Sequence, residues 1–322
     1  MLLRCQAPAL LLVVTIVGLA GNESRAQAVP SPDKPAASPA AAIEVVEKIV
    51  YSEVAGKKLE LDLAKPKGDG PFPGLVFIHG GGWKGGNRQG YRGEIERAAR
   101  RGYTAVTITY RLTNPDKTEK AESPFPAQIH DVKQAIRWLR AHAVEHKLDP
   151  SRIGAIGGSA GGHLALLAGL TDKESGLEGL DAPVDSDTRI QAVVNYFGPT
   201  DFVHYDNIPV VLRLFRELLG GTPDQVPDAY RLVSPVTHAS SDDPPVLTLH
   251  GDKDEIVPVS QAELLDKKIK DVGGRHELVV LTGQGHGFGG EHGLRALKLQ
   301  DEFFDKHLKS AKPAAAKPSA SK

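Results

Sequence analysis

The sequence predicts an α/β fold: a mostly parallel central sheet with helices on both faces and an antiparallel hairpin at its N-terminal end. Short runs of apolar and β-branched residues recur along the chain, as in strands buried on both faces. Helical patterns lie between most of them, and this alternation is typical of parallel sheets. These strands are expected at 74–79, 104–110, 153–156, 192–197, 246–250 and 277–281. The helices are expected at 90–101, 126–146, 160–171, 258–272 and 291–309.

The hairpin precedes the first buried strand. Residues 44–53 and 58–64 alternate apolar with polar side chains around a turn at 55–57. This period of two predicts an antiparallel pair that is half exposed to water.

Composition excludes several classes of protein. Of 322 residues, 40% are hydrophobic and 25% are charged, which excludes collagen-like, coiled-coil and wholly disordered chains. Lys and Arg number 39 against 40 Asp and Glu, so no basic field is available for nucleic acid. Scattered His and Asp form no HExxH or comparable metal spacing. We therefore expect no metal and no organic cofactor.

The first 28 residues have the pattern of a signal peptide. Arg4 precedes an apolar run at 9–21, and Ala26-Gln27-Ala28 has the form of a signal-peptidase site. Cleavage after Ala28 would export the chain to the periplasm or beyond, without a stable membrane anchor, because the run is too short to span a bilayer. An uncleaved N-terminal anchor is the alternative. The single cysteine, Cys5, lies in this segment, so the mature chain would hold no disulfide.

Two further segments lack the apolar periodicity of a folded core. Residues 29–42 are an Ala, Pro and Ser-rich linker, and 310–322 form a tail of Ala, Pro, Lys and Ser that we expect to be disordered. The folded domain is therefore expected at 43–309.

A serine motif follows the strand at 153–156. Gly157-Gly158-Ser159-Ala160-Gly161 matches G-x-S-x-G at a strand-to-helix junction, where small neighbours let the serine hydroxyl project at a helix N-terminus. The pattern is short, so its context carries the prediction that Ser159 is a nucleophile. The alternative is a serine that merely caps the helix.

A glycine run follows the strand at 74–79. His79-Gly80-Gly81-Gly82-Trp83 leaves backbone N–H groups uncovered, as an oxyanion site for acyl transfer requires. The expected donors are Gly81 and Gly82 together with Ala160. A mobile glycine loop is the alternative, and Trp83 could line a substrate pocket or close the core.

Acidic residues and a histidine complete the set. After the strand at 246–250, Asp252 or Asp254 could orient a catalytic histidine, while Asp252 could instead serve a turn. His286, in a glycine-flanked loop after the last strand, is the expected base. His250 is expected to make a core hydrogen bond, and His276 is expected to be solvated.

These motifs resemble the α/β-hydrolase superfamily, and more narrowly its carboxylesterase branch of hormone-sensitive-lipase-like and bacterial feruloyl-esterase-like (BD-FAE type) enzymes. The resemblance covers about residues 43–309 and includes Tyr110-Arg111-Leu112. It selects Asp254 over Asp252, and the order Ser159, Asp254, His286 agrees with that family. No N-terminal helical cap is expected from 29–42.

The resemblance also implies where a lid would lie and what the chain would do. A lid would come from 198–244, where 208–219 is expected to form a short amphipathic helix. The implied activity is hydrolysis of small acyl, acetyl or feruloyl esters, free or linked to polysaccharide, through an acyl-enzyme. An arylformamidase-like or peptidase-like amide hydrolase and a catalytically inactive binding module are the alternatives. The sequence predicts no oligomeric state.

Overall fold

The computed structural model describes residues 42–113, 123–179 and 188–310. The expected signal peptide at 1–28 lies outside the described residues, as do almost all of the 29–42 linker and of the 310–322 tail. Within the described ranges, no helix has both the length and the apolar character needed to cross a membrane.

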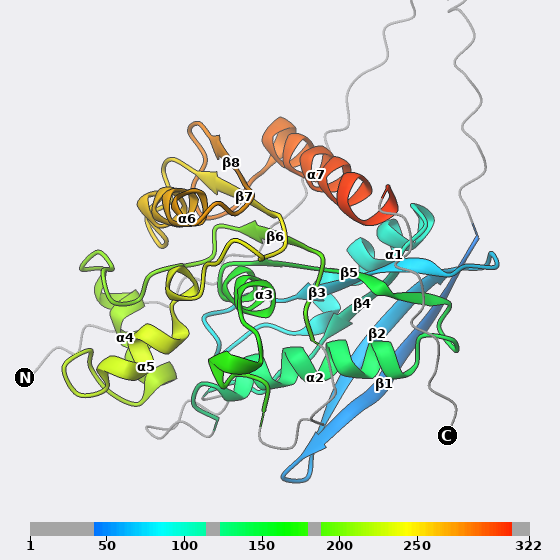
Figure 1. Cartoon of the computed structure of the whole chain (residues 1–322), viewed down its shortest axis with the longest axis horizontal. Helices are drawn as coiled ribbons and strands as arrows, with labels where there is room; N and C mark the ends of the chain where they lie inside the picture. The colour runs from blue at the N-terminus through cyan, green and yellow to red at the C-terminus, as the bar shows by residue number, and fades with distance from the viewer. Residues whose placement is uncertain (1–41, 114–122, 180–187, 311–322) are drawn as a thin grey trace, which may run out of the picture. The chain divides into compact units, whose positions relative to one another are not determined.

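Eight strands form one sheet in the order β1-β2-β4-β3-β5-β6-β7-β8. β1 pairs antiparallel with β2, and β2 with β4, whereas the pairs from β4 through β8 are parallel. This is the predicted fold class (Figure 1). The strands are β1 (Ile43–Val54), β2 (Lys57–Pro66), β3 (Phe72–Ile78), β4 (Thr104–Ile108), β5 (Leu148–Gly158), β6 (Ala192–Tyr196), β7 (Val246–Gly251) and β8 (His276–Leu281).

The hairpin is only partly as expected. β1 is an edge strand with exposed positions, but β2 is buried from Leu61 onward because it lies between β1 and β4. The expectation of a half-exposed β2 was therefore wrong. Asp62 on β2 is fully buried and accepts hydrogen bonds from Arg88 Nε and Arg92 Nε at 3.0 and 3.1 Å. Ion pairs take the place of water at this position.

Helices cover both faces of the sheet. The α1 and α7 helices pack on one face, while α2, α3 and α6 pack on the other. Figure 1 shows α1 beside α7, and Arg97 on α1 donates to Asp301 on α7 at 2.6 Å. The helices are α1 (Arg92–Arg100), α2 (Ala127–Ala141), α3 (Ala160–Leu170), α4 (Pro209–Leu219), α5 (Pro227–Val233), α6 (Ser260–Asp271) and α7 (Gly290–Phe304). Shorter helical turns are η1 (Arg88–Tyr91), η2 (Lys173–Ser175), η3 (Pro235–Thr237) and the π-helical η4 (Asp305–Lys309).

One helix is shorter than its sequence pattern predicts. The helix expected at 126–146 ends at Ala141, and turns occupy the residues from there to β5. Lys147 has a φ of 53°, and Leu148 N donates to Ala143 O at 2.8 Å. The chain must reverse here to enter β5, and this requirement overrides the helical pattern.

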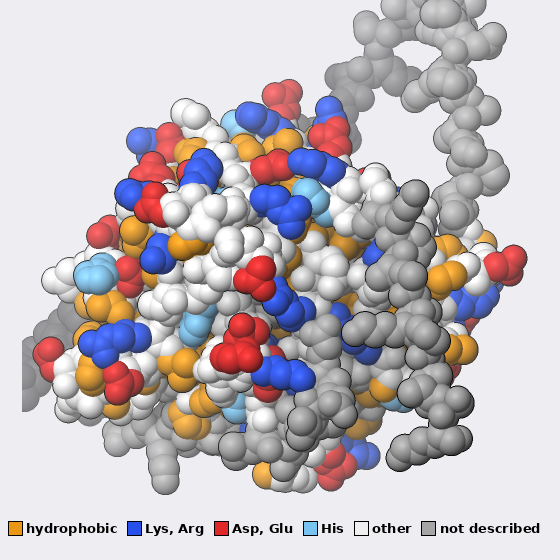
Figure 2. Space-filling view, in the orientation of Figure 1, with side chains coloured by type: hydrophobic (Ala, Val, Ile, Leu, Met, Phe, Trp, Pro, Cys, Tyr) orange, Lys and Arg blue, Asp and Glu red, His pale blue; other side chains and the backbone are white. Residues whose placement is uncertain are grey.

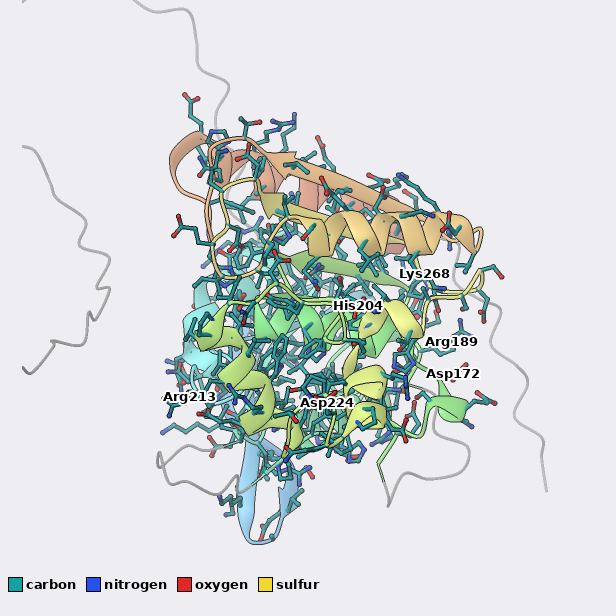
Figure 3. All side chains as sticks on the ribbon, turned by 90° about the vertical axis from the view of Figure 1, so that its left-hand side faces the viewer. Asp172, Arg189, His204, Arg213, Asp224 and Lys268 are labelled. Carbon is teal, nitrogen blue, oxygen red and sulfur yellow. The ribbon has the colours of Figure 1, made fainter. Side chains whose placement is uncertain are left out.

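The candidate lid at 198–244 contains the expected helix as α4 and a second helix, α5. The sequence did not indicate α5, which is too short to show a clear period. Phe215 and Leu218 of α4 are fully buried, so the segment is joined to the main core. Figure 3 views the molecule from this side and labels His204, Arg213 and Asp224. On the face in Figure 2, acidic and basic side chains are interspersed.

Candidate active site

Four candidate segments leave the sheet at one edge. β3, β5, β7 and β8 are parallel, and the loops that carry the candidate residues follow their carboxyl ends. Ligands of open α/β sheets bind at this edge. The topology therefore brings the glycine run, the serine motif, the acidic loop and the histidine loop to the same side of the sheet.

Ser159 occupies a strained turn between β5 and α3. Its φ and ψ are 56° and −122°, in a region that non-glycine residues rarely adopt. The turn is tight, since a Cβ at Gly161 would lie 2.0 Å from the carbonyl oxygen of Ile78. Ser159 makes no side-chain capping hydrogen bond, so the helix-cap alternative does not describe it. Its hydroxyl lies at the N-terminus of α3, where developing negative charge is favoured.

The glycine loop lies directly against this turn. A Cβ at Gly80 would lie 3.4 Å from Ser159 Cβ. Three consecutive residues, Gly81, Gly82 and Trp83, have positive φ values of 115°, 60° and 59°. Within the described ranges the amides of Gly81 and Gly82 donate to no protein group, and that of Ala160, the first residue of α3, is unpaired by helix geometry.

Contacts on both sides hold the loop. His79 Nδ1 donates to Gly80 O at 2.9 Å, and the His79 ring stacks on Tyr110 with centroids 4.2 Å apart. Burial lowers the pKa of His79, which keeps the ring neutral. On the other side, Lys84 Nζ pairs with Glu217 of α4 at 2.8 Å. These contacts brace the glycine loop from both sides.

Trp83 belongs to the core. Its side chain is 3% exposed and packs beside Phe202 and Phe215. Its indole Nε1 donates to Nδ1 of His163 at 3.2 Å. Of the two roles left open by the sequence, the core contacts of Trp83 are the ones that the structure shows.

Asp254, and not Asp252, contacts the histidine. Asp254 Oδ2 lies 2.8 Å from Nδ1 of His286, while Asp252 Oδ1 accepts from Gly283 N at 2.6 Å in a turn. Burial alone would raise the pKa of Asp254, but hydrogen bonds from His250, His286 and the Val257 amide hold it well below its ordinary value of 3.8. Asp254 is therefore ionised and positioned to orient the imidazole of His286.

His250 supports the same carboxylate. Its ring is fully buried, and Nε2 donates to Val257 O at 2.7 Å while lying 3.5 Å from Asp254 Oδ2. The expected core hydrogen bond is confirmed. The expectation for His276 was wrong, because that ring is buried between Asp266 Oδ1 and Thr248 Oγ1, both 2.8 Å away.

Phe197 joins the serine turn to the histidine loop, a role that the sequence reasoning missed. Its ring centroid lies 4.6 Å from that of His286, and a Cβ at Gly158 would lie 3.5 Å from the same ring. Its φ of 41° is strained. The available signal was its position directly after β6, the strand that pairs with β5.

Two candidate side-chain atoms, Ser159 Oγ and His286 Nε2, are unpaired among the described residues. The His286 side chain is 24% exposed, so substrate or water can reach it. Catalytic hydrogen bonds are often long in ligand-free enzymes and shorten only in the complex.

Metal ligation finds no support among the described residues. In residues 42–113, 123–179 and 188–310, no group of three or more His, Cys, Asp or Glu side chains is placed to hold a metal ion. A serine hydroxyl, an imidazole paired with a carboxylate, and free backbone amides are the groups that acyl transfer through a serine nucleophile uses.

Comparison with known proteins agrees with this chemistry. The model of the BD-FAE family matches residues 61–269. The chain is 35% identical over 221 residues to the probable carboxylic ester hydrolase LipM of Mycobacterium tuberculosis. The matched region covers 67% of this chain and 48% of LipM. The chain is 33% identical over 248 residues to esterase LipC of the same organism, covering 75% of this chain and 59% of LipC. The chain thus spans about half the length of these curated relatives.

Solved structures are matched over more of their length. Est2, an esterase of the planctomycete Thermogutta terrifontis solved with propionate bound, has a TM-score of 0.68 at 30% identity, covering 83% of this chain and 94% of Est2. A truncated carbohydrate esterase from gut microbiota has a TM-score of 0.72 at 28% identity, covering 84% of this chain and 98% of that structure.

Proposed function

The chain belongs to the BD-FAE family and has the α/β-hydrolase fold, and from that premise we propose that it is a serine carboxylesterase. Ser159 is the nucleophile, His286 the general base and Asp254 the residue that orients His286. The amides of Gly81, Gly82 and Ala160 form the oxyanion hole. The observation that carries the proposal is the 2.8 Å contact between Asp254 and His286, beside a serine turn that the glycine loop touches.

Acylation follows from these positions. His286 Nε2 takes the hydroxyl proton while Ser159 Oγ bonds to the ester carbonyl carbon, and the carbonyl electron pair moves onto oxygen. The three amides donate hydrogen bonds to that oxyanion. When the intermediate collapses, the bond to the alcohol oxygen breaks and this oxygen takes the proton from His286.

Deacylation repeats the same steps with water. His286 takes a proton from water as the water oxygen bonds to the acyl carbon, and the oxyanion again forms among the amides. Collapse breaks the bond to Ser159 Oγ, which recovers its proton from His286. Asp254 stays ionised throughout, because its depressed pKa keeps the carboxylate available to stabilise the imidazolium.

Small acyl esters are the proposed substrates. Est2 was solved with propionate and with butyrate, and another matched structure is a carbohydrate esterase. These relatives support small acyl or acetyl esters, with feruloyl and polysaccharide-linked esters as further members of the class.

Replacing Ser159 by Ala tests the proposal. Wild type should hydrolyse p-nitrophenyl acetate, and Ser159→Ala should abolish turnover while the circular dichroism spectrum and melting temperature stay close to wild type. Undiminished turnover in the variant would refute the assignment.

Covalent labelling gives a second readout. Est2 is phosphorylated by paraoxon, so the wild-type chain treated with paraoxon should gain the mass of one diethylphosphoryl group on the peptide that contains Ser159. A wild-type chain that neither turns over esters nor accepts the label would be an inactive binding module. Faster turnover of p-nitroanilide amides than of matched esters would favour the amide hydrolase.

A further inference from the structure

A cavity of 280 Å³ adjoins the proposed machinery on the face of the sheet that α1 and α7 cover. Its wall includes Gly158, the residue before Ser159, and Phe197, whose ring packs against His286. Phe288, two residues after His286, forms another part of the wall. The cavity therefore reaches the backbone of both catalytic loops.

The wall is apolar and aromatic, with one buried amide. Gln300 on α7 is 3% exposed, and its Oε1 accepts from the hydroxyl of Tyr196 at 2.8 Å. Within the described residues, Gln300 Nε2 donates to no protein group. A buried amide with unused donors on a cavity wall is expected to hydrogen bond to whatever fills that cavity. The carboxylate of Glu94, also on the wall, is paired with Arg97 at 3.0 Å.

The cavity has a defined direction. A Cβ at Gly158 would lie 3.5 Å from both the Tyr91 hydroxyl and the Phe197 ring, so the cavity begins where a side chain at 158 would be. Tyr196 pairs with Gly158 across β5 and β6, and its ring extends to Gln300. The cavity thus runs along Tyr196 from the nucleophile's neighbour to the Gln300 amide.

We propose that this cavity receives the acyl group of the substrate, and that Gln300 selects acyl groups with a hydrogen-bond acceptor near their far end. The inference rests on the proposed function and deepens it. The leaving alcohol takes its proton from His286 and needs an open exit, whereas the acyl group stays bonded to Ser159 until water attacks. The wall of this cavity is mostly apolar and reaches the backbone beside the nucleophile, so it suits a group that stays attached there.

The volume sets the size of that group. An apolar cavity of about 150 Å³ is sufficient for benzene, so 280 Å³ accommodates a ring with a short linker or an aliphatic chain of medium length. The acceptor oxygen of the acyl group would lie at the Gln300 end.

An isosteric pair of esters tests the role of Gln300. In p-nitrophenyl 5-methoxypentanoate, one methylene of p-nitrophenyl heptanoate is replaced by an ether oxygen. We expect wild type to favour the ether by about threefold to tenfold in kcat/KM, as one hydrogen bond allows. Gln300→Met should reverse this preference. Tyr196→Phe, which removes the same Tyr–Gln hydrogen bond but leaves the amide, is the matched control and should keep the preference.

A second variant tests the position of the acyl group. Gly158→Ala places a methyl group at the mouth of the cavity in ordinary contact with its neighbours. It should lower kcat/KM for heptanoate relative to acetate by about tenfold. The ratio of kcat/KM between hexyl acetate and methyl acetate should not change.

Three outcomes would overturn the inference: no ether preference in wild type, an ether preference that survives in Gln300→Met, or a Gly158→Ala effect on the alcohol series in place of the acyl series. Each of these requires a wild type that hydrolyses esters. A wild type that is inactive on every ester and unlabelled by paraoxon would instead refute the proposed function, so the two failures are distinguishable.

Discussion

The indole Nε1 of Trp83 donates a hydrogen bond of 3.2 Å to Nδ1 of His163, and this bond joins the glycine loop to the helix that follows Ser159. His163 Nε2 in turn donates to Val233 O of α5 at 2.8 Å. One neutral imidazole therefore links the loop of Gly81 and Gly82, the helix of Ala160 and the insertion between β6 and β7. All three proposed oxyanion donors lie on segments that this ring connects.

Trp83→Phe should weaken both the fold and the catalysis. The change keeps an aromatic ring in the core but leaves His163 Nδ1 buried without a partner, which costs about 1–3 kcal/mol of unfolding free energy. We expect kcat to fall about tenfold with KM within about twofold, because donors that act on the oxyanion contribute mainly in the transition state. Urea denaturation and steady-state kinetics measure the two effects. Trp138→Phe, on α2, is the control, and an unchanged kcat in Trp83→Phe would mean that the bond serves stability alone.

Asp254→Asn and Asp252→Asn should have different effects on kcat, because only Asp254 contacts His286. An amide at 254 cannot stabilise the imidazolium of His286 and favours the wrong tautomer, so kcat on p-nitrophenyl acetate should fall by about 10³–10⁴. Asp252→Asn disturbs only the turn hydrogen bond to Gly283 N and should change kcat less than about threefold. Equal losses in the two variants would contradict the assignment of Asp254.

His163 should make the protein less stable in mild acid. Burial lowers the pKa of His163 to about 4, from an ordinary value of 6.5. Between these two values the unfolded chain binds a proton at this ring and the folded chain does not, so the unfolding free energy falls as the pH falls through this window. One such proton changes stability by about 1.4 kcal/mol per pH unit.

The measurement is the urea midpoint and m-value at several pH values between 7 and 4.5. His163→Gln should remove the contribution of this proton, so the slope of the unfolding free energy against pH should fall by about 1.4 kcal/mol per pH unit. The exposed His204, whose side chain is 80% accessible, provides the control variant His204→Gln. Identical slopes in wild type and His163→Gln would show that His163 is protonated in the folded state.

Gly161→Ala should be among the most damaging single-methyl changes. The new Cβ would meet the backbone carbonyls of Ile78 and His79 at 2.0 and 2.7 Å, and neither can move without opening β3. We expect a loss of more than about 3 kcal/mol or failure to fold. Gly93→Ala on α1 meets nothing within 4 Å and should stabilise by about 0.5–1 kcal/mol. The melting temperatures of the two variants and of wild type measure these effects. A Gly161→Ala variant as stable as wild type would mean that the serine turn is packed less tightly than the structure shows.

Much of the fold could be predicted because its signals are local. Buried parallel strands are continuous apolar runs, so the positions of β3 to β8 followed from composition within short windows. Prediction failed for Asp62 and His276, which look polar and solvated in sequence but are buried against charged or hydroxyl partners from distant segments. Burial depends on which strands flank a residue, and that order is not local information.

The sequence by itself determined the serine turn, the glycine loop and the histidine loop, because each depends on small residues and a strand-to-helix junction a few positions apart. Only the tertiary structure decided between Asp254 and Asp252 on geometric grounds, placed Trp83 in the core, and brought the Phe197 ring against both His286 and the turn that holds Gly158. It also placed Gln300 beside Tyr196, 104 positions away in the chain. Local conformation is encoded by neighbours in sequence, whereas the pairing of side chains across a site depends on strand order and helix packing, which involve the whole domain.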